Sequence, residues 1–230
     1  MSTIRREGVR RKFLVLLASL ILLLVLYPYV GPESGGEIFF KVLTSIVLIA
    51  GVHAVSDSRR ALIVAALFAS AALLSGWLYV VTDIPALNVA ENAISLIFYT
   101  HTTIIILTVV LRSRAITTDT IYGAICVYLL IGLTYANGYT FIETMNPGSF
   151  YASAVHEPGG RLAFPDLLYY SFVTMTTLGY GDITPITNQA RSLAMLEAVS
   201  GVLYVAVLIS RLIGSLGRSS GSDGDEEQKK

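Results

Sequence analysis

The sequence predicts an all-α membrane protein in which six helices cross the bilayer and one shorter helix enters it without crossing. Hydrophobic residues make up 54% of the 230-residue chain and charged residues 14%, whereas about a quarter of the residues of a soluble protein are charged. Six apolar stretches come near the roughly 20 residues that a helix needs to cross the bilayer core. They cover residues 13–30, 38–55, 61–81, 93–111, 121–142 and 193–213.

The first stretch follows a run of basic residues and resembles a secretory signal in that respect. No small-residue cleavage motif comes after it, and Tyr27-Pro28-Tyr29 is typical of a helix end at the membrane interface. We therefore expect this stretch to be a retained membrane helix.

The basic residues predict the orientation, because Lys and Arg accumulate in cytoplasmic loops. With the N-terminus in the cytoplasm, only Lys41, Arg161 and Arg191 of the sixteen Lys and Arg residues fall toward the outside. The prediction is a multi-pass protein of the cell membrane with both termini cytoplasmic. Residues 1–12 form the N-terminal segment, and short loops make sequence neighbours pack as antiparallel hairpins.

A segment of mixed polarity, residues 143–192, separates the fifth stretch from the sixth. Within it, residues 164–176 predict a short helix, with Pro165 in the first turn and Asp166 complementing the helix dipole there. About eleven helical residues cover roughly 16 Å, which is half of a bilayer. The helix is followed at once by Thr-Leu-Gly-Tyr-Gly at residues 177–181, which we call the glycine segment.

Residues 174–182, with the sequence Thr-Met-Thr-Thr-Leu-Gly-Tyr-Gly-Asp, resemble the signature of the potassium channel superfamily. The resemblance is close over residues 121–213. For the first four stretches, only the number of helices resembles that of the family. It implies a potassium-selective channel whose pore domain, residues 115–213, consists of an outer helix, a re-entrant pore helix, a selectivity-filter loop and an inner helix.

The resemblance assigns the ligands of the permeant ion, which are the carbonyl oxygens of Thr177, Leu178, Gly179 and Tyr180 together with the Thr177 hydroxyl. Taking an ion out of water costs tens of kcal/mol unless other oxygens replace the water. Successive carbonyls point at one axis when the backbone angles alternate in hand, and Gly179 and Gly181 accept the positive φ that this requires. We expect no cofactor, only K+ as the permeant ligand.

The expected assembly is a homotetramer, because one chain supplies one such loop and four loops are needed to surround an ion. A different subunit that completes the ring is the alternative. Membrane lipids and an unidentified regulatory protein are further expected partners, and nucleic acid is not expected.

Three residues match positions that support the filter in the family. Tyr169 and Tyr170 stand where aromatic residues hold the filter at its width, although tyrosines of an ordinary interfacial belt would have the same pattern. Asp182 matches the acidic residue at the outer mouth, where it would hydrogen-bond the aromatic residues and attract cations. Val173 stands where some family members carry a buried Glu, so behaviour that depends on that carboxyl group is not expected.

Five residues of the sixth stretch are candidates for gating. Gly201 stands where related channels have a hinge glycine, and a role in close helix packing is equally open. Glu197, an acid inside an apolar span, is expected to tie this helix to the short helix rather than to bind ions. Val205, Ile209 and Ile213 form an apolar stripe that either closes the pore by excluding water or packs against lipid or protein.

The first four stretches, residues 13–114, resemble a voltage-sensor domain in topology. Residues 93–111 contain no Arg or Lys, and a helix without charges extracts almost no work from the membrane field. We therefore expect weak or absent voltage dependence. Residues 214–230 are rich in Gly, Ser and acidic residues, and we expect a short, disordered cytoplasmic tail.

Three other functions fit the sequence less well. A potassium transporter with filter-like loops resembles four unequal pore units in one chain, and this chain has one unit. A non-conducting regulatory subunit would not need the intact threonine and glycines. Enzymatic activity has no support, because the sequence shows no nucleophile constellation and no metal-ligand spacing.

Overall fold

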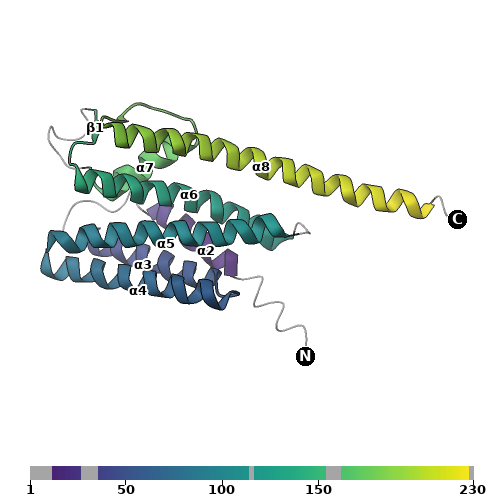
Figure 1. Ribbon diagram of the computed structural model, residues 1–230, viewed down its shortest axis with the longest axis horizontal. Coiled ribbons are helices and arrows are strands. Elements are labelled where there is room, and N and C mark those ends of the chain that lie inside the picture. Colours follow the sequence, from purple (N-terminus) through teal and green to yellow (C-terminus); the bar gives the residue numbers. More distant parts are fainter. Residues whose placement is uncertain (1–11, 27–35, 114–116, 154–161, 228–230) are drawn as a thin grey trace.

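The computed structural model describes residues 12–26, 36–113, 117–153 and 162–227 (Figure 1). The chain is almost entirely helical there, as predicted. The helices are α2 Lys12–Leu26, α3 Gly36–Ala54, α4 Arg59–Thr82, α5 Pro85–Arg112, α6 Thr118–Met145, α7 Phe164–Met175 and α8 Asn188–Glu227, and the strands are β1 Phe150–Ala152 and β2 Ile183–Pro185.

A helix is present at each of the six predicted apolar stretches. Among the described residues, four helical spans are long and apolar enough to cross a membrane: Arg59–Thr82, Pro85–Arg112, Thr118–Met145 and Asn188–Arg211. Helices α2 and α3 are apolar but shorter. The first predicted stretch reaches residue 30, whereas α2 ends at Leu26 and residues 27–35 lie outside the described part of the chain.

The last helix is longer than predicted. We expected the helix to end at residue 213 and a disordered tail to follow, but α8 continues to Glu227 and projects beyond the other helices (Figure 1). Once a helix is nucleated, each added residue gains one hydrogen bond. Propagation from the apolar part of α8 therefore extends into a sequence whose composition alone indicated disorder.

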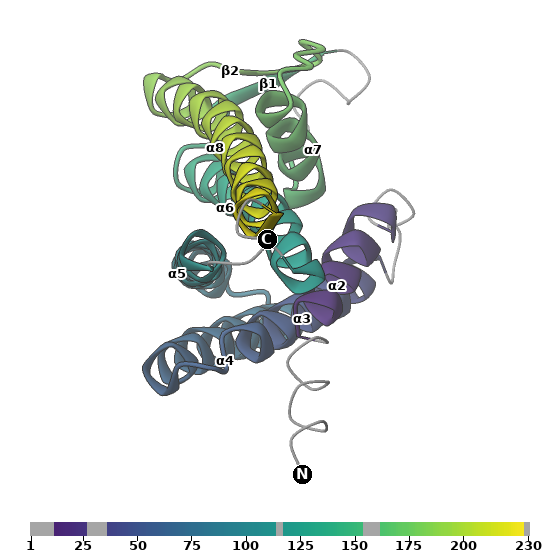
Figure 2. The ribbon, with the colours of Figure 1, turned by 90° about the vertical axis from the view of Figure 1, so that its right-hand side faces the viewer.

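The helices form two groups that meet at α6. Viewed along the helices, α2, α3, α4 and α5 lie on one side, α7 and α8 lie on the other, and α6 stands between them (Figure 2). Helix α6 packs against α5 and α2 in the first group and against α7 and α8 in the second. The first group and α6 share a core in which Leu16, Phe98, Ile106 and Leu130 are almost completely buried.

Local sequence signals account for several helix ends. The Ser58 side chain accepts a hydrogen bond from the Ala61 backbone N–H at the start of α4, and Thr117 caps α6 in the same way through Thr120. Pro85 occupies the first turn of α5, where its missing N–H costs nothing.

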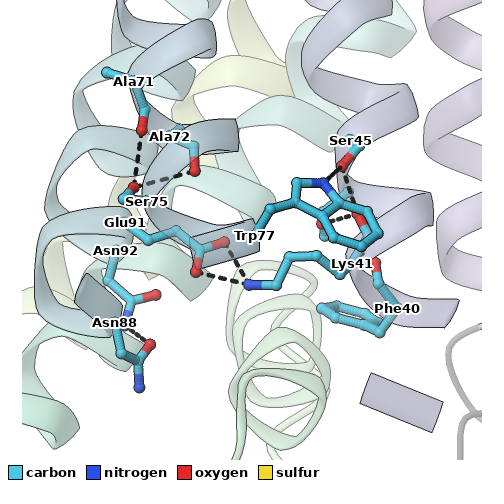
Figure 3. A network of polar contacts seen from close by, with 11 residues as sticks. Phe40, Lys41, Ser45, Ala71, Ala72, Ser75, Trp77, Asn88, Glu91 and Asn92 are labelled. Atoms are coloured by element: carbon cyan, nitrogen blue, oxygen red, sulfur yellow. Dashed lines mark hydrogen bonds and ion pairs between the residues drawn. The ribbon is translucent and has the colours of Figure 1, made fainter. Parts of the chain in front are cut away.

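An ion pair crosses the first group of helices. The Nζ atom of Lys41 on α3 lies 2.6 and 2.7 Å from the two carboxylate oxygens of Glu91 on α5 (Figure 3). The two side chains are only 15% and 16% exposed. Gly76 on α4 makes room for the carboxylate, since a Cβ atom there would lie 2.5 Å from a Glu91 oxygen. The neighbouring Trp77 donates a hydrogen bond to Ser45 at 3.3 Å.

We predict that Lys41→Met lowers the free energy of unfolding by about 3 kcal/mol, the low end for a buried pair, because Glu91 is left with an unpaired charge. The free energy of unfolding is measured by SDS titration of the detergent-solubilised protein. The fluorescence of Trp77, the sole tryptophan of the chain, reports unfolding. The double variant Lys41→Met/Glu91→Gln should recover most of the loss.

The matched control for this prediction is Asp57→Asn. Asp57 pairs with Lys12, but its side chain is 63% exposed, and exposed pairs contribute about 1 kcal/mol or less. The prediction would be contradicted if Lys41→Met lowered the free energy of unfolding by no more than Asp57→Asn does.

Candidate functional site

The short helix α7 begins with the predicted signals. Pro165 lies in its first turn, and the Asp166 carboxylate accepts a hydrogen bond from the backbone N–H of Ala163 at 2.9 Å. Helix α7 packs against both α6 and α8, with Leu167 and Leu168 fully buried. The helix ends at Met175, one residue before the predicted end, and leads directly into the glycine segment.

The glycine segment has a backbone of alternating hand. Gly179 and Gly181 have φ values of 59° and 78°, as the sequence predicted, and Thr177 has a φ of 61°. Positive φ therefore recurs at every second residue. This conformation is costless for glycine but strained for threonine, so a positive φ at Thr177 is not expected from its residue type.

Hydrogen bonds from the end of α7 hold the start of the glycine segment. The Val173 carbonyl accepts from the backbone N–H groups of Leu178 at 2.9 Å and Gly179 at 3.3 Å, and the Thr174 carbonyl accepts from Thr177 at 3.0 Å. Residues 176–181 are nevertheless all exposed on the single chain, and Leu178 and Tyr180 are 54% and 67% exposed. The segment is fixed through its backbone and open on its other side.

Asp182 anchors the far end of the segment. Its carboxylate accepts a hydrogen bond from the Tyr169 hydroxyl at 2.7 Å, so two of the predicted support residues lie together. Its backbone carbonyl accepts from the Ser153 N–H at 2.7 Å. The following strand, β2, pairs antiparallel with β1. The loop after the segment is thereby tied to α7 and to the chain that leaves α6.

Tyr170 has a different environment from Tyr169. It is 6% exposed and packs edge-on against Tyr139 on α6 and Phe150 on β1, with ring centroids 5.1 and 5.4 Å apart. Edge-to-face packing of this kind stabilises aromatic clusters. Tyr170 therefore belongs to the internal core of its own chain and is not an exposed interfacial tyrosine.

Glu143 is a supporting residue that the sequence reasoning missed. Its side chain is buried, and its two carboxylate oxygens accept from the backbone N–H groups of Gly148 at 2.9 Å and Phe150 at 3.2 Å. These bonds place β1, and so β2, against the end of α6. An acid at the end of an apolar stretch was the available signal, but the sequence did not indicate its partners.

Glu197 joins three helices, and among them it links α8 to the short helix α7, as we expected. It is fully buried and is hydrogen-bonded to Tyr139 on α6 and to Ser171 on α7. The Ser171 hydroxyl also contacts the Gly132 carbonyl at 2.7 Å. A serine hydroxyl has a single proton, so it can satisfy Gly132 and Glu197 together only if the carboxyl group is protonated and donates to it.

The remaining gating candidates lie on α8. A Cβ atom on Gly201 would come within 2.6 Å of Met175 Cγ and 2.7 Å of the Met175 carbonyl oxygen. The close approach of α8 to the end of α7 therefore requires glycine, which accounts for Gly201 by packing. Val205 and Ile209 are 39% and 50% exposed. The side chain of Ile213 lies outside the described part of the structure.

The donor atoms offered by the site are oxygens of peptide and hydroxyl groups. Among the described residues, no group of three or more His, Cys, Asp or Glu side chains is placed to hold a metal ion. The oxygen atoms of residues 177–181 are those of their peptide groups and of the Thr177 and Tyr180 hydroxyls.

Comparison with known proteins identifies the same part of the chain. Residues 127–217, which include the whole site, match the family described as "Ion channel". Mouse potassium voltage-gated channel subfamily A member 5 is 30% identical over 108 residues, which are 46% of this chain and 16% of that protein. Rice two pore potassium channel c is 35% identical over 86 residues, which are 37% of this chain and 18% of that protein. This part of the chain belongs to the ion channel family, and these two relatives are potassium channels.

The chain aligns with less than a fifth of the length of these relatives. No solved structure matches it significantly. The family consists of ion channels and not of enzymes. The family match begins within α6, so the first four helices of the chain lie outside it.

We predict that Glu197→Ala lowers the free energy of unfolding by about 3 kcal/mol, because Tyr139 and Ser171 both lose a buried partner. Glu197→Gln is the matched control. A neutral amide can donate to Ser171 and accept from Tyr139, so its effect should stay within about 1 kcal/mol. The free energies are compared by SDS titration. Equal losses in the two variants would contradict a protonated carboxyl group at this position.

Proposed function

We propose that the chain is a subunit of a potassium-selective channel that conducts K+ passively across the cell membrane. The observation that carries the proposal is the recurrence of positive φ at Thr177, Gly179 and Gly181. Alternating backbone hand turns successive carbonyl groups toward the same side of the chain. The carbonyls of Thr177, Leu178, Gly179 and Tyr180, with the Thr177 hydroxyl, then replace the water that the ion loses.

The short helix α7 supports cation binding as a pore helix that enters the membrane without crossing it. The C-terminal end of a helix carries a partial negative charge of roughly half an electron, and in α7 this end leads directly into the glycine segment. Asp182 adds a carboxylate at the other end of the segment, where it would attract cations to the outer mouth.

A homotetramer accounts for the surfaces that a single chain leaves uncovered. The glycine segment is exposed, and a groove of about 270 Å³ beside it is lined by Leu24 of α2 and by α7 residues that include Leu168 and Phe172. Helix α8 exposes apolar side chains over much of its length; they include Met195, Leu196, Val199, Val202, Leu203 and Val207. Four copies around one axis would bring the segments together and cover these surfaces.

We place both termini in the cytoplasm and the β1–β2 sheet outside, with α2 to α6 and α8 as six spans surrounded by membrane lipid. The distribution of Lys and Arg supports this orientation. The gate lies either at the cytoplasmic part of α8, where the exposed Val205 and Ile209 would meet in four copies, or at the glycine segment itself.

The proposal predicts that Gly179→Ala abolishes selective K+ flux, because alanine disfavours the φ of 59° by about 1 kcal/mol or more in each of four subunits. Uptake of rubidium into liposomes is measured with sodium uptake and barium block as controls. Gly148→Ala is the matched substitution. Gly148 also has a positive φ, of 85°, but lies in the loop after α6, and flux should persist. Equal sodium and rubidium uptake by the unaltered protein would refute selectivity.

A second prediction concerns voltage. Helix α5 carries no Arg or Lys over residues 93–111, and each elementary charge that crosses 100 mV yields about 2.3 kcal/mol. Open probability should therefore change little between −100 and +100 mV in a planar bilayer. A steep conductance–voltage relation equivalent to several gating charges would show that charges elsewhere in the chain sense the field.

A further inference from the structure

The last turn of α7 lies tightly between two glycines of neighbouring helices. A Cβ atom on Gly132 of α6 would lie 2.9 Å from Phe172 Cζ and 3.1 Å from Met175 Cε. One on Gly201 of α8 would lie 2.6 Å from Met175 Cγ. Close packing of this kind fixes the separation of the helices. Apolar contacts have no preferred direction, however, so they do not fix the rotation of α7 about its own axis.

Hydrogen bonds of Ser171 supply the missing direction, because they weaken steeply when their angle changes. The Ser171 hydroxyl lies 2.7 Å from the carbonyl oxygen of Gly132 on α6 and is hydrogen-bonded to the carboxyl group of Glu197 on α8. Tyr139 of α6 binds the other oxygen of Glu197. Ser171, Tyr139 and Glu197 are all fully buried. One carboxyl group therefore fixes the rotation of α7 relative to both neighbouring helices.

Ser171 lies just before the two residues that hold the glycine segment. The carbonyls of Val173 and Thr174 accept the backbone N–H groups of residues 177–179. A rotation of α7 would move these two carbonyls and, with them, the start of the glycine segment. Discrimination between K+ and Na+ depends on the size or the coordination of the ring of carbonyls around the ion. The rotation of α7 would therefore affect selectivity.

Glu197 can make this link only as a neutral acid. Ser171 has one hydroxyl proton, and if the Gly132 carbonyl accepts it, the proton between Ser171 and Glu197 belongs to the carboxyl group. The ion pairs among the described residues do not include Glu197. The titratable groups that interact with it are the hydroxyls of Tyr128, Tyr139 and Tyr170. An ionised Glu197 would lack both a compensating charge and a proton for Ser171.

We propose that protonated Glu197 is a positioning residue for the glycine segment. Through Ser171 it fixes the rotation of α7, and so the placement of the carbonyl oxygens that select K+ over Na+. Loss of the carboxyl group or of its proton lets α7 turn and lowers selectivity. This role rests on the proposed channel function and is independent of the position of the gate.

The test compares the uptake of rubidium and of sodium by liposomes that hold the unaltered protein or a variant. Glu197→Ala and Ser171→Ala remove the link and should lower the ratio of rubidium to sodium uptake about five-fold or more, which corresponds to one ordinary hydrogen bond. Glu197→Gln keeps a neutral donor for Ser171 and an acceptor for Tyr139, so it should retain most of the ratio. An unchanged ratio in Glu197→Ala, or an equal loss in Glu197→Gln, overturns the proposal.

A pH profile tests the role of the proton. Rising pH removes the carboxyl proton, so the uptake ratio of the unaltered protein should fall between about pH 6 and about pH 9, a range in which a tyrosine hydroxyl keeps its proton. Glu197→Gln has no such proton, and its ratio should not fall. The matched control, Asp57→Asn, removes an acid whose side chain is 63% exposed and should keep the profile of the unaltered protein. A flat profile in the unaltered protein, or an equal fall in Glu197→Gln, overturns the proposal.

Hydrogen exchange separates this proposal from the proposed function. The backbone N–H groups of Leu178 and Gly179 donate to the Val173 carbonyl. Mass spectrometry of the detergent-solubilised protein should show faster exchange in the peptide that contains them in Glu197→Ala and Ser171→Ala than in Glu197→Gln, by a larger factor than in α4. If the unaltered protein shows no selective uptake, the channel function fails. Equal exchange of this peptide in the three variants then overturns the positioning role, and the expected difference supports it.

Discussion

The structure depends on fixing the conformation of one exposed stretch of backbone, residues 177–181, whose carbonyl groups accept no hydrogen bonds of a helix. Residues 177–181 satisfy few of their own hydrogen bonds, because an alternating backbone hand does not allow the ladder of a helix or a sheet. The neighbouring elements supply the missing constraint at each end. The Val173 and Thr174 carbonyls fix the start, and Asp182 with the β1–β2 pair fixes the finish.

Buried polar groups also fix the helices and strands that support residues 177–181. Glu143 places β1 through two backbone N–H groups, and Glu197 joins α6, α7 and α8 at one point. Buried polar groups are costly unless every partner is in place. Such a network therefore favours one arrangement of the helices over others that would bury a similar apolar area.

The two groups of helices differ in how far the ion-channel family match covers them. The ion-channel family match covers α7 and most of α6 and α8, and it does not include α2 to α5. In the first group, Lys41 on α3 pairs with Glu91 near the start of α5, and residues 93–111 of α5 carry no Arg or Lys. Contacts nevertheless join the groups at both ends: Phe40 on α3 packs against Phe164 at the start of α7, with centroids 5.4 Å apart, and Arg211 binds the end of α5.

The sequence by itself determined the helical membrane class, the positions of the helices, the short helix α7 and the positive φ of Gly179 and Gly181. These depend on apolar length, on proline and acidic residues at a helix start, and on the lack of a Cβ atom, all of which are local properties. Only the tertiary structure decided the positive φ of Thr177, the core position of Tyr170, the partners of Glu143 and Glu197, and the reach of Arg211 to α5. Each of these depends on a group distant in the sequence, and side-chain type and spacing do not specify which distant group a folded chain brings into contact.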